Sequence, residues 1–347
     1  MKLRTFTCIL AMSLVLAGCS KDTDKETPKI EKKEVKVEKE VSAQDEFVNQ
    51  YPLSGIGTDE SVDGRAIAVM VNNHPKARPQ TGLIKADIVF EMLAEGDVTR
   101  FLAVFQSEKP EQVGPVRSAR DYYVRLAKGL DSIFIAHGYS PDARELLESG
   151  YIDNLNGMKY DGTLFQRASF RKAPHNSYIT FDKIEKGISD NSYDATSPPK
   201  GFSFLTEEQI KDLTGKTAES IQISYGSPAF DSAFKYDQGA GKYMRYSNGE
   251  QTVDYETKEP AAIDNLLVIE APHQVIDNSG RRDIDLKAGG KAILLQKGKV
   301  NEVKWQNIDG RVVPFLGDKE AGLIPGKTWV AVVPEAGIAS DISLNSK

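Results

Sequence analysis

The sequence predicts an α/β domain followed by a β-rich domain. In the first half, short β-branched and aromatic runs alternate with amphipathic segments. In the second half, apolar runs are separated by turn signals, with one short helical segment among them. The 347 residues are 40% hydrophobic and 27% charged, which is typical of a globular protein. We therefore expect an α/β domain at residues 51–195 and a β-rich domain at residues 202–347.

The α/β domain is expected to contain four strands and two helices. Ser118 to Leu130 has apolar positions at i, i+3, i+4 and i+7, which indicates a helix. A second helix should begin after Ser140-Pro141, because serine caps helices and proline suits the first helical position. The expected strands are 66–73, 87–96, 100–107 and 131–138.

The β-rich domain is expected to begin after the proline-rich stretch Thr196 to Gly201, which interrupts regular structure. One short helix is expected at Thr206 to Leu213. Ser247-Asn248-Gly249 and Lys297-Gly298-Lys299 are typical of hairpin turns, where glycine supplies a positive φ. The expected strands are 221–226, 234–237, 242–247, 266–271, 291–296, 302–306 and 328–333.

The N-terminus has the organisation of an export signal. Lys2 and Arg4 precede an apolar stretch at 5–16 that is too short to span a bilayer. The following Leu-Ala-Gly-Cys at 16–19 resembles the bacterial lipobox, which implies cleavage before Cys19 and attachment of a diacylglyceryl group to its sulfur. Residues 1–18 are thus expected to be a lipoprotein signal peptide. Residues 19–50, rich in Lys and Glu, are expected to be a disordered tether.

This anchor would place the protein on the outer face of the cytoplasmic membrane, with membrane lipid as a partner through the acylated Cys19. The other cysteine, Cys8, would leave with the signal peptide, so disulfides, cysteine-zinc sites and cysteine nucleophiles are not expected. The net charge of -6, without a dense basic segment, argues against direct nucleic-acid binding. We expect no cofactor and no metal, since none of the four histidines lies at ligand spacing from another.

The segment Gly114 to Asp121 carries the strongest indication of a ligand site. Ser118 and Asp121 resemble a capping box, and Arg117 and Arg120 would flank the helix N-terminus, where free backbone N–H groups favour an anion. Other polar residues in turns and at strand ends of this domain could converge on the same edge, namely Arg78, Arg100, Arg167, Arg171, His137 and His175. The alternative is that these arginines form structural salt bridges with Glu91, Glu95, Asp97 or Asp121.

Three long segments, RPQTGLIKADIVFEMLAEGDVTRF, GPVRSAR and RKAPHNSY, carry a family resemblance. With them, the whole mature chain resembles the YerB-like family of bacterial lipoproteins, a two-domain family of unknown function. The resemblance implies a lipid-anchored extracytoplasmic protein and supplies no catalytic residue. A second, six-residue likeness runs from Ala119 to Val124 and is similar to the Pro-Arg-Asp-x-Tyr-Val segment of LytR-CpsA-Psr cell-wall transferases, with Ala119 in place of the proline.

Together these observations favour a non-enzymatic accessory protein that binds an anionic envelope ligand or an unidentified protein partner. The alternative is an envelope enzyme acting on a phosphate-bearing, polyprenyl-linked substrate. In that case Arg117 and Arg120 would hold the phosphate electrostatically, and Asp121 or Glu91 would serve as a base or metal ligand.

Overall fold

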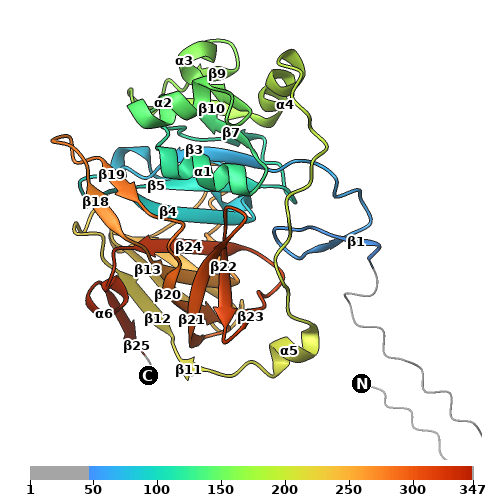
Figure 1. Ribbon diagram of the computed structural model, residues 1–347, viewed down its shortest axis with the longest axis vertical. Coiled ribbons are helices and arrows are strands. Elements are labelled where there is room, and N and C mark those ends of the chain that lie inside the picture. Colours follow the sequence, from blue (N-terminus) through green and yellow to red (C-terminus); the bar gives the residue numbers. More distant parts are fainter. Residues whose placement is uncertain (1–46, 346–347) are drawn as a thin grey trace, which may run out of the picture. The chain divides into compact units, whose positions relative to one another are not determined.

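The computed structural model describes residues 47–345, and a twelve-stranded sheet runs through them (Figure 1). From one edge to the other its strands are β23 (Lys319–Glu320), β22 (Arg311–Leu316), β21 (Lys299–Ile308), β20 (Gly290–Gln296), β17 (Asn265–Glu270), β24 (Thr328–Val333), β4 (Ile88–Glu95), β5 (Val98–Phe105), β3 (Ile67–Asn72), β7 (Ile133–Ala136) and β8 (Asn154–Asn156), with β11 (Lys216–Thr217) paired to β21. Because β24 pairs in parallel with β4, both halves of the chain contribute to one sheet.

Smaller sheets and short helices cover this sheet. A six-stranded sheet contains β15 (Glu250–Gln251), β14 (Lys242–Ser247), β13 (Ser232–Asp237), β12 (Ser220–Ile223), β25 (Ile342–Asn345) and β16 (Ala262–Ile263). The other small sheets are β6 (Gln112–Val113) with β10 (Ser177–Thr180) and β9 (Phe165–Arg167), β1 (Asn49–Gln50) with β2 (Gly57–Thr58), and β18 (His273–Val275) with β19 (Arg282–Ile284). The α-helices are α1 (Asp121–Gly129), α2 (Pro141–Glu148), α3 (Gly157–Tyr160), α4 (Phe181–Asp190), α5 (Glu207–Lys211) and α6 (Gly337–Ser340), and Pro75–Ala77 and Leu83–Lys85 form 3₁₀ turns.

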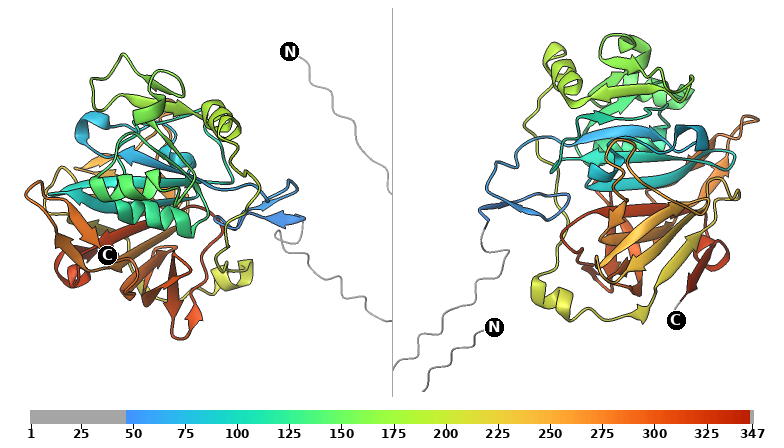
Figure 2. Two further views of the ribbon diagram at one scale, coloured as in Figure 1. Left: turned by 45° about the horizontal axis from the view of Figure 1, so that its top comes forward. Right: turned by 180° about the vertical axis from the view of Figure 1, so that it is seen from behind.

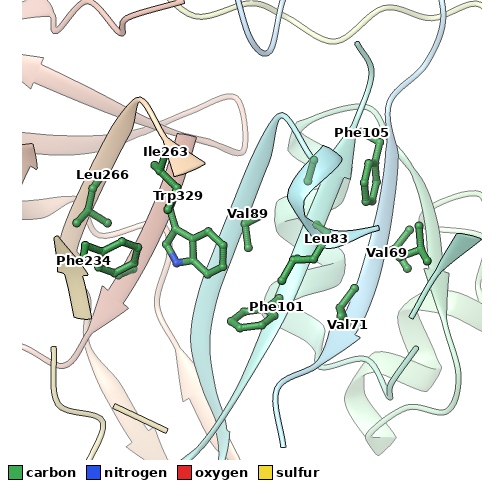
Figure 3. Close-up of a cluster of buried hydrophobic side chains, with 14 of the residues drawn as sticks. Val69, Val71, Leu83, Val89, Phe101, Phe105, Phe234, Ile263, Leu266 and Trp329 are labelled. Carbon is green, nitrogen blue, oxygen red and sulfur yellow. The ribbon is translucent and has the colours of Figure 1, made fainter. Parts of the chain in front are cut away.

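The core lies in two layers, one on each face of the large sheet, because successive side chains of a strand point to opposite faces. Val69 belongs to the layer that also contains Phe234 of β13, whereas Met70 belongs to the layer that contains Leu126 of α1. Figure 2 shows the six-stranded sheet and α1 on different sides of the large sheet. In the first layer the Trp329 ring lies edge-on to the rings of Phe101 and Phe234, at centroid distances of 5.2 and 6.0 Å (Figure 3).

The structure confirms part of the predicted fold class. The chain is strand-rich, and the second half is β-rich as predicted. In the first half, β4, β5 and β3 are antiparallel neighbours, while β3, β7 and β8 are parallel. Strand and helix therefore alternate in only part of this half, and an α/β domain is not clearly shown. Residues 196–201 contain neither helix nor strand, and a domain boundary there stays a prediction.

The local signals at helix α2 and at two hairpins are confirmed. The Ser140 hydroxyl accepts a hydrogen bond from the backbone N–H of Ala143 at 3.3 Å, as expected of an N-cap. The turn at Asn248-Gly249 has φ of 51° and 79°, and that at Lys297-Gly298 has φ of 47° and 72°. Both pairs thus adopt the left-handed conformations that tight hairpins require.

The prediction of a capping box at Ser118 is wrong. Helix α1 begins at Asp121, its N-cap is Arg120, and no side chain caps it. The Ser118 hydroxyl instead donates to the backbone carbonyl of His137 at 3.2 Å. A serine hydroxyl readily bonds to nearby backbone groups outside helices, and here a carbonyl of the loop after β7 is the partner.

The expected signal peptide and the lipidated Cys19 lie outside the described residues, as does most of the expected tether. Within residues 47–345, no helix is both long and apolar enough to cross a membrane.

Candidate anion-binding site

The candidate site lies where loops following β3 and β7 meet the start of β10. The backbone N–H of Arg117 donates to the carbonyl of Met70 at 2.9 Å, and the Arg117 carbonyl accepts from His137 N–H at 3.1 Å. The neighbouring Val116 N–H donates to the Ser177 carbonyl at 2.7 Å. Strands β3 and β7 are parallel, so the residues that follow them emerge at the same edge of the sheet. The segment around Arg117 is therefore held from both sides by sheet elements.

Arg117 is the central charge of the site. Its side chain is half-buried, and it makes no hydrogen bond or ion pair within residues 47–345. Burial, reinforced by the nearby charge of Arg100, lowers the pKa of Arg117 to about 10. The Arg117 charge in turn contributes to lowering the pKa values of His74, His137 and His175. A partly buried cation without a carboxylate partner is unfavourable alone and would be stabilised by an anion.

Two stacked imidazoles stand near Arg117. The rings of His74 and His175 have centroids 4.4 Å apart and planes inclined by 24°. The Nδ1 atom of His74 accepts a hydrogen bond from Lys76 N–H at 3.1 Å. The Nδ1 atom of His175 lies 3.0 Å from the side-chain nitrogen of Asn72. This nitrogen is the donor, because the side-chain oxygen of Asn72 already accepts from His74 N–H. Both neutral rings therefore carry their proton on Nε2. Neither Nε2 has a hydrogen-bond partner in the described part of the chain, so each can donate to a ligand.

His137 is fully engaged by protein groups. Arginine can only donate, so His137 Nε2 must accept from Arg167 Nη2 at 2.8 Å. His137 Nδ1 then carries the proton and donates to the Ser177 hydroxyl at 2.7 Å. Arg167 is paired with Asp161 at 2.9 Å. His137 and Arg167 thus frame the site, although neither offers a free donor at these atoms.

Arg100 and Arg120 share the carboxylate of Glu95. Arg100 Nη2 lies 2.8 Å from Glu95 Oε2, its Nη1 donates to the Ser118 carbonyl at 2.6 Å, and Arg120 pairs with the other oxygen of Glu95. The structural salt bridges considered as an alternative are therefore confirmed for these two arginines. Asp121 pairs instead with Arg125, at 3.5 Å.

The remaining two arginines are held by backbone carbonyls. Arg78 donates to the carbonyls of Asn73 and Ala229, at 3.0 and 2.8 Å. Arg171 donates to the carbonyls of Pro79 and, at 3.4 Å, Lys76. Five of the six predicted arginines thus have protein partners. Only Arg117 of these six lacks one within residues 47–345, and the convergence of the six on one ligand-binding edge stays a prediction.

Arg117 acts electrostatically on His175, another predicted site residue, and also on His74, which was not among the residues predicted for the anion site. Asn72 ends strand β3 and His74 follows it closely, and this position at a strand terminus was the available signal. In the described part of the chain, no three His, Cys, Asp or Glu side chains gather closely enough to hold a metal ion.

Glu91, one of the two carboxylates considered as a base, is enclosed in the core. Its side chain is fully buried and pairs with Arg245, whose Nη2 lies 2.7 Å from Oε1. Trp329 Nε1 and Asn73 Nδ2 also donate to it, at 3.1 and 3.3 Å. A carboxylate with these partners is shielded from solvent, and its ion pair with Arg245 joins the two halves of the chain.

Comparison with known proteins identifies a family and related proteins to which this chain is similar. A family model described as "Protein of unknown function (DUF3048) N-terminal domain" matches residues 53–194, and its C-terminal counterpart matches residues 221–330. The chain is 47% identical over 292 residues to "Putative lipoprotein YerB" of Bacillus subtilis, covering 83% of this chain and 87% of that protein. The crystal structure of YerB from Bacillus subtilis is similar with a TM-score of 0.79 at 45% identity, covering 86% of this chain and all of that one.

Proposed function

Since the chain belongs to the DUF3048 family, described as proteins of unknown function, we propose that it is a lipid-anchored extracytoplasmic protein that binds an anionic ligand at Arg117. The half-buried, unpaired guanidinium of Arg117 carries this proposal. The ligand would receive hydrogen bonds from that guanidinium and from the Nε2–H groups of His74 and His175. A guanidinium presents a planar fork that matches phosphate and carboxylate oxygens.

Binding is favoured over catalysis by the surroundings of Arg117. No carboxylate offsets the burial that lowers its pKa, and the two carboxylates considered as a base are engaged elsewhere. Glu91 is enclosed with Arg245, and Asp121 pairs with Arg125 on α1. A general base must lie within hydrogen-bond reach of the proton that it removes. Among the described residues, the site thus offers donors for an anion and no free carboxylate base.

The anchoring part of the proposal rests on the sequence at Cys19 and on the similarity to a protein named as a lipoprotein. Replacing the sulfur, in Cys19→Ser, should prevent lipid attachment and move the protein from the membrane fraction to the soluble fraction. Incorporation of labelled palmitate, followed by fractionation, measures this. An unlabelled wild-type protein, or a variant that fractionates as the wild type does, would contradict the anchoring.

The ligand-binding part is tested by titrating the protein with inorganic phosphate at low ionic strength, followed by calorimetry. We expect saturable binding to the wild type. Removal of the charge in Arg117→Gln should weaken it about tenfold to hundredfold, since a hydrogen bond to a charged group contributes about 1.5–3 kcal/mol. Arg117→Lys should give an intermediate affinity, because the charge is kept and the fork is lost.

Arg144→Gln is the matched control. Arg144 lies on α2, is exposed and pairs with Glu148 of the same helix at 2.8 Å. Its loss should leave phosphate affinity unchanged, since exposed charges are screened by solvent and salt. Equal weakening in the Arg144 and Arg117 variants would show general attraction of anions to a basic surface, and the proposed site would be refuted.

A further inference from the structure

An exposed aromatic ring stands beside Arg171, a residue predicted to belong to the anion site. Phe170, in the loop between β9 and β10, is 52% exposed. Its ring stacks on that of Tyr255, with centroids 4.8 Å apart and planes inclined by only 3°. Phe170 belongs to the first half of the chain and Tyr255 to the second, so the stack is fixed from both sides. Aromatic rings combine a large contact area with low conformational freedom, so a ring held in a stack with one face exposed can serve as a contact for a ligand.

The outer face of the Phe170 ring is open. The Arg171 guanidinium carbon lies 5.6 Å from the Phe170 centroid and 5.4 Å from the Tyr255 centroid, and these nearly equal distances place it beside the stack. Tyr178 approaches Phe170 at 5.9 Å and an inclination of 50°, but Tyr178 is itself buried and so lies on the protein side. Since Tyr255 covers one face, the 52% exposure of Phe170 must include the other face.

The backbone contacts of Arg171 connect this ring to the anion site. Arg171 Nη1 donates to the carbonyl of Lys76, whose own N–H donates to Nδ1 of His74. The Arg171 charge also helps to lower the pKa of His175. The Arg171 side chain therefore links the Phe170 ring to the turn that holds His74, and its charge reaches His175.

We propose that this surface takes a phosphorylated saccharide, with the phosphate at Arg117, His74 and His175 and a sugar ring on the open face of Phe170. This inference rests on the proposed anion binding. A pyranose has a flat face of C–H groups that can cover an aromatic ring, while its hydroxyls stay hydrated. An acidic protein partner fits less well, because a stable protein interface needs about 800 Å² on each side and a single ring offers far less apolar area.

The test compares inorganic phosphate with glucose 1-phosphate in calorimetric titrations of the wild type, Phe170→Ala and Phe170→Tyr. In the wild type, glucose 1-phosphate should bind about threefold to tenfold more tightly than phosphate, the gain expected of one ring contact. Phe170→Ala should remove this gain and Phe170→Tyr should keep it. The affinity for inorganic phosphate should be the same in all three proteins, which also shows that the variants are folded.

The outcomes separate the two proposals. If phosphate binds but the sugar adds no affinity, or if the gain survives in Phe170→Ala, the saccharide inference is overturned while anion binding stands. If neither compound binds, both are overturned. Phenyl phosphate serves as the third probe: a Phe170-dependent gain for phenyl phosphate with none for glucose 1-phosphate assigns the ring to an aromatic ligand and overturns the saccharide.

Discussion

Glu91 and Arg245 form an ion pair that spans the two halves of the chain and is almost fully excluded from solvent. Glu91 is 0% and Arg245 1% exposed, with Nη2 to Oε1 at 2.7 Å and Nε to Oε2 at 3.3 Å. The guanidinium carbon also lies 5.0 Å from the Phe101 ring centroid and 4.8 Å from that of Trp329. This pair offers a direct measure of how strongly residues 53–194 and 221–330 depend on each other.

The perturbation is Glu91→Gln, which leaves the Arg245 charge buried without its counterion. Breaking a buried pair by removing one partner costs about 3–5 kcal/mol, because the remaining charge cannot be solvated. The double variant Glu91→Gln with Arg245→Met removes both charges and fills the space between the rings with an apolar side chain. Its cost should be well below the sum of the two single costs, by about 2 kcal/mol or more.

Urea unfolding, followed by tryptophan fluorescence and by circular dichroism, measures the free energy of unfolding. Glu91→Gln should lower the midpoint strongly while both probes still report one shared transition. The control is Asp190→Asn, which removes the exposed pair of Lys186 and Asp190 on α4. An exposed helix pair of this kind contributes only about 0.3–0.5 kcal/mol.

Two results would refute this reasoning. If Glu91→Gln changed the free energy of unfolding as little as Asp190→Asn does, the pair could not couple the two halves. If the fluorescence and circular dichroism transitions separated in the wild type, the halves would unfold independently despite the shared sheet.

Two pH dependences follow from the histidines. The pKa of His74 is lowered mainly by burial, and then by the charges of Lys76, Arg78 and Arg117. The pKa of His175 is lowered mainly by burial, and then by the charges of His74, Arg117, Lys76 and Arg171. Both rings are therefore neutral at pH 7. Sulfate is a suitable probe because it keeps its charge between pH 8 and 5. Calorimetry should show tighter sulfate binding below pH 6.5, as these rings protonate. A sulfate affinity that does not change with pH would contradict a role of the two histidines in binding. Burial lowers the pKa of His273 to about 4. Between pH 6.5 and 4 the unfolded chain binds a proton at His273 while the folded state does not. The free energy of unfolding should therefore fall by up to about 3 kcal/mol as the pH drops to 4. Urea unfolding should show a smaller decrease in His273→Gln.

The sequence predicted most of the large strands because their apolar runs are long and end at clear turn residues. Strand β3 and the hairpin of β13 and β14 are examples, and both lie within about two residues of the expected bounds. The joining of the two halves could not be predicted. The parallel pairing of Thr328 with Ile88 brings together residues far apart in the chain, and local periodicity carries no signal for such a pairing.

The candidate site was predicted in part for a similar reason. An arginine signals a charge, but only tertiary structure shows which carboxylate or carbonyl it meets. Glu95 could be named as a partner from the sequence, yet its sharing between Arg100 and Arg120 depends on the contact between strand β4, strand β5 and the start of α1. The stack of His74 on His175 depends equally on two loops distant in the sequence.

The unpaired state of Arg117 is difficult to explain by stability alone. The chain has 50 acidic and 44 basic residues, so carboxylates are plentiful. The other five arginines predicted for this site all form ion pairs or hydrogen bonds with protein groups. Meanwhile, the backbone of Arg117 is fixed by Met70 on one side and His137 on the other, so the guanidinium starts from a rigid base. A cation whose backbone is fixed, and which is partly desolvated and left without a counterion, raises the free energy of the empty protein. The same partial desolvation strengthens the attraction to an anion, and the fixed backbone limits the part of the chain that must be ordered on binding to the Arg117 side chain.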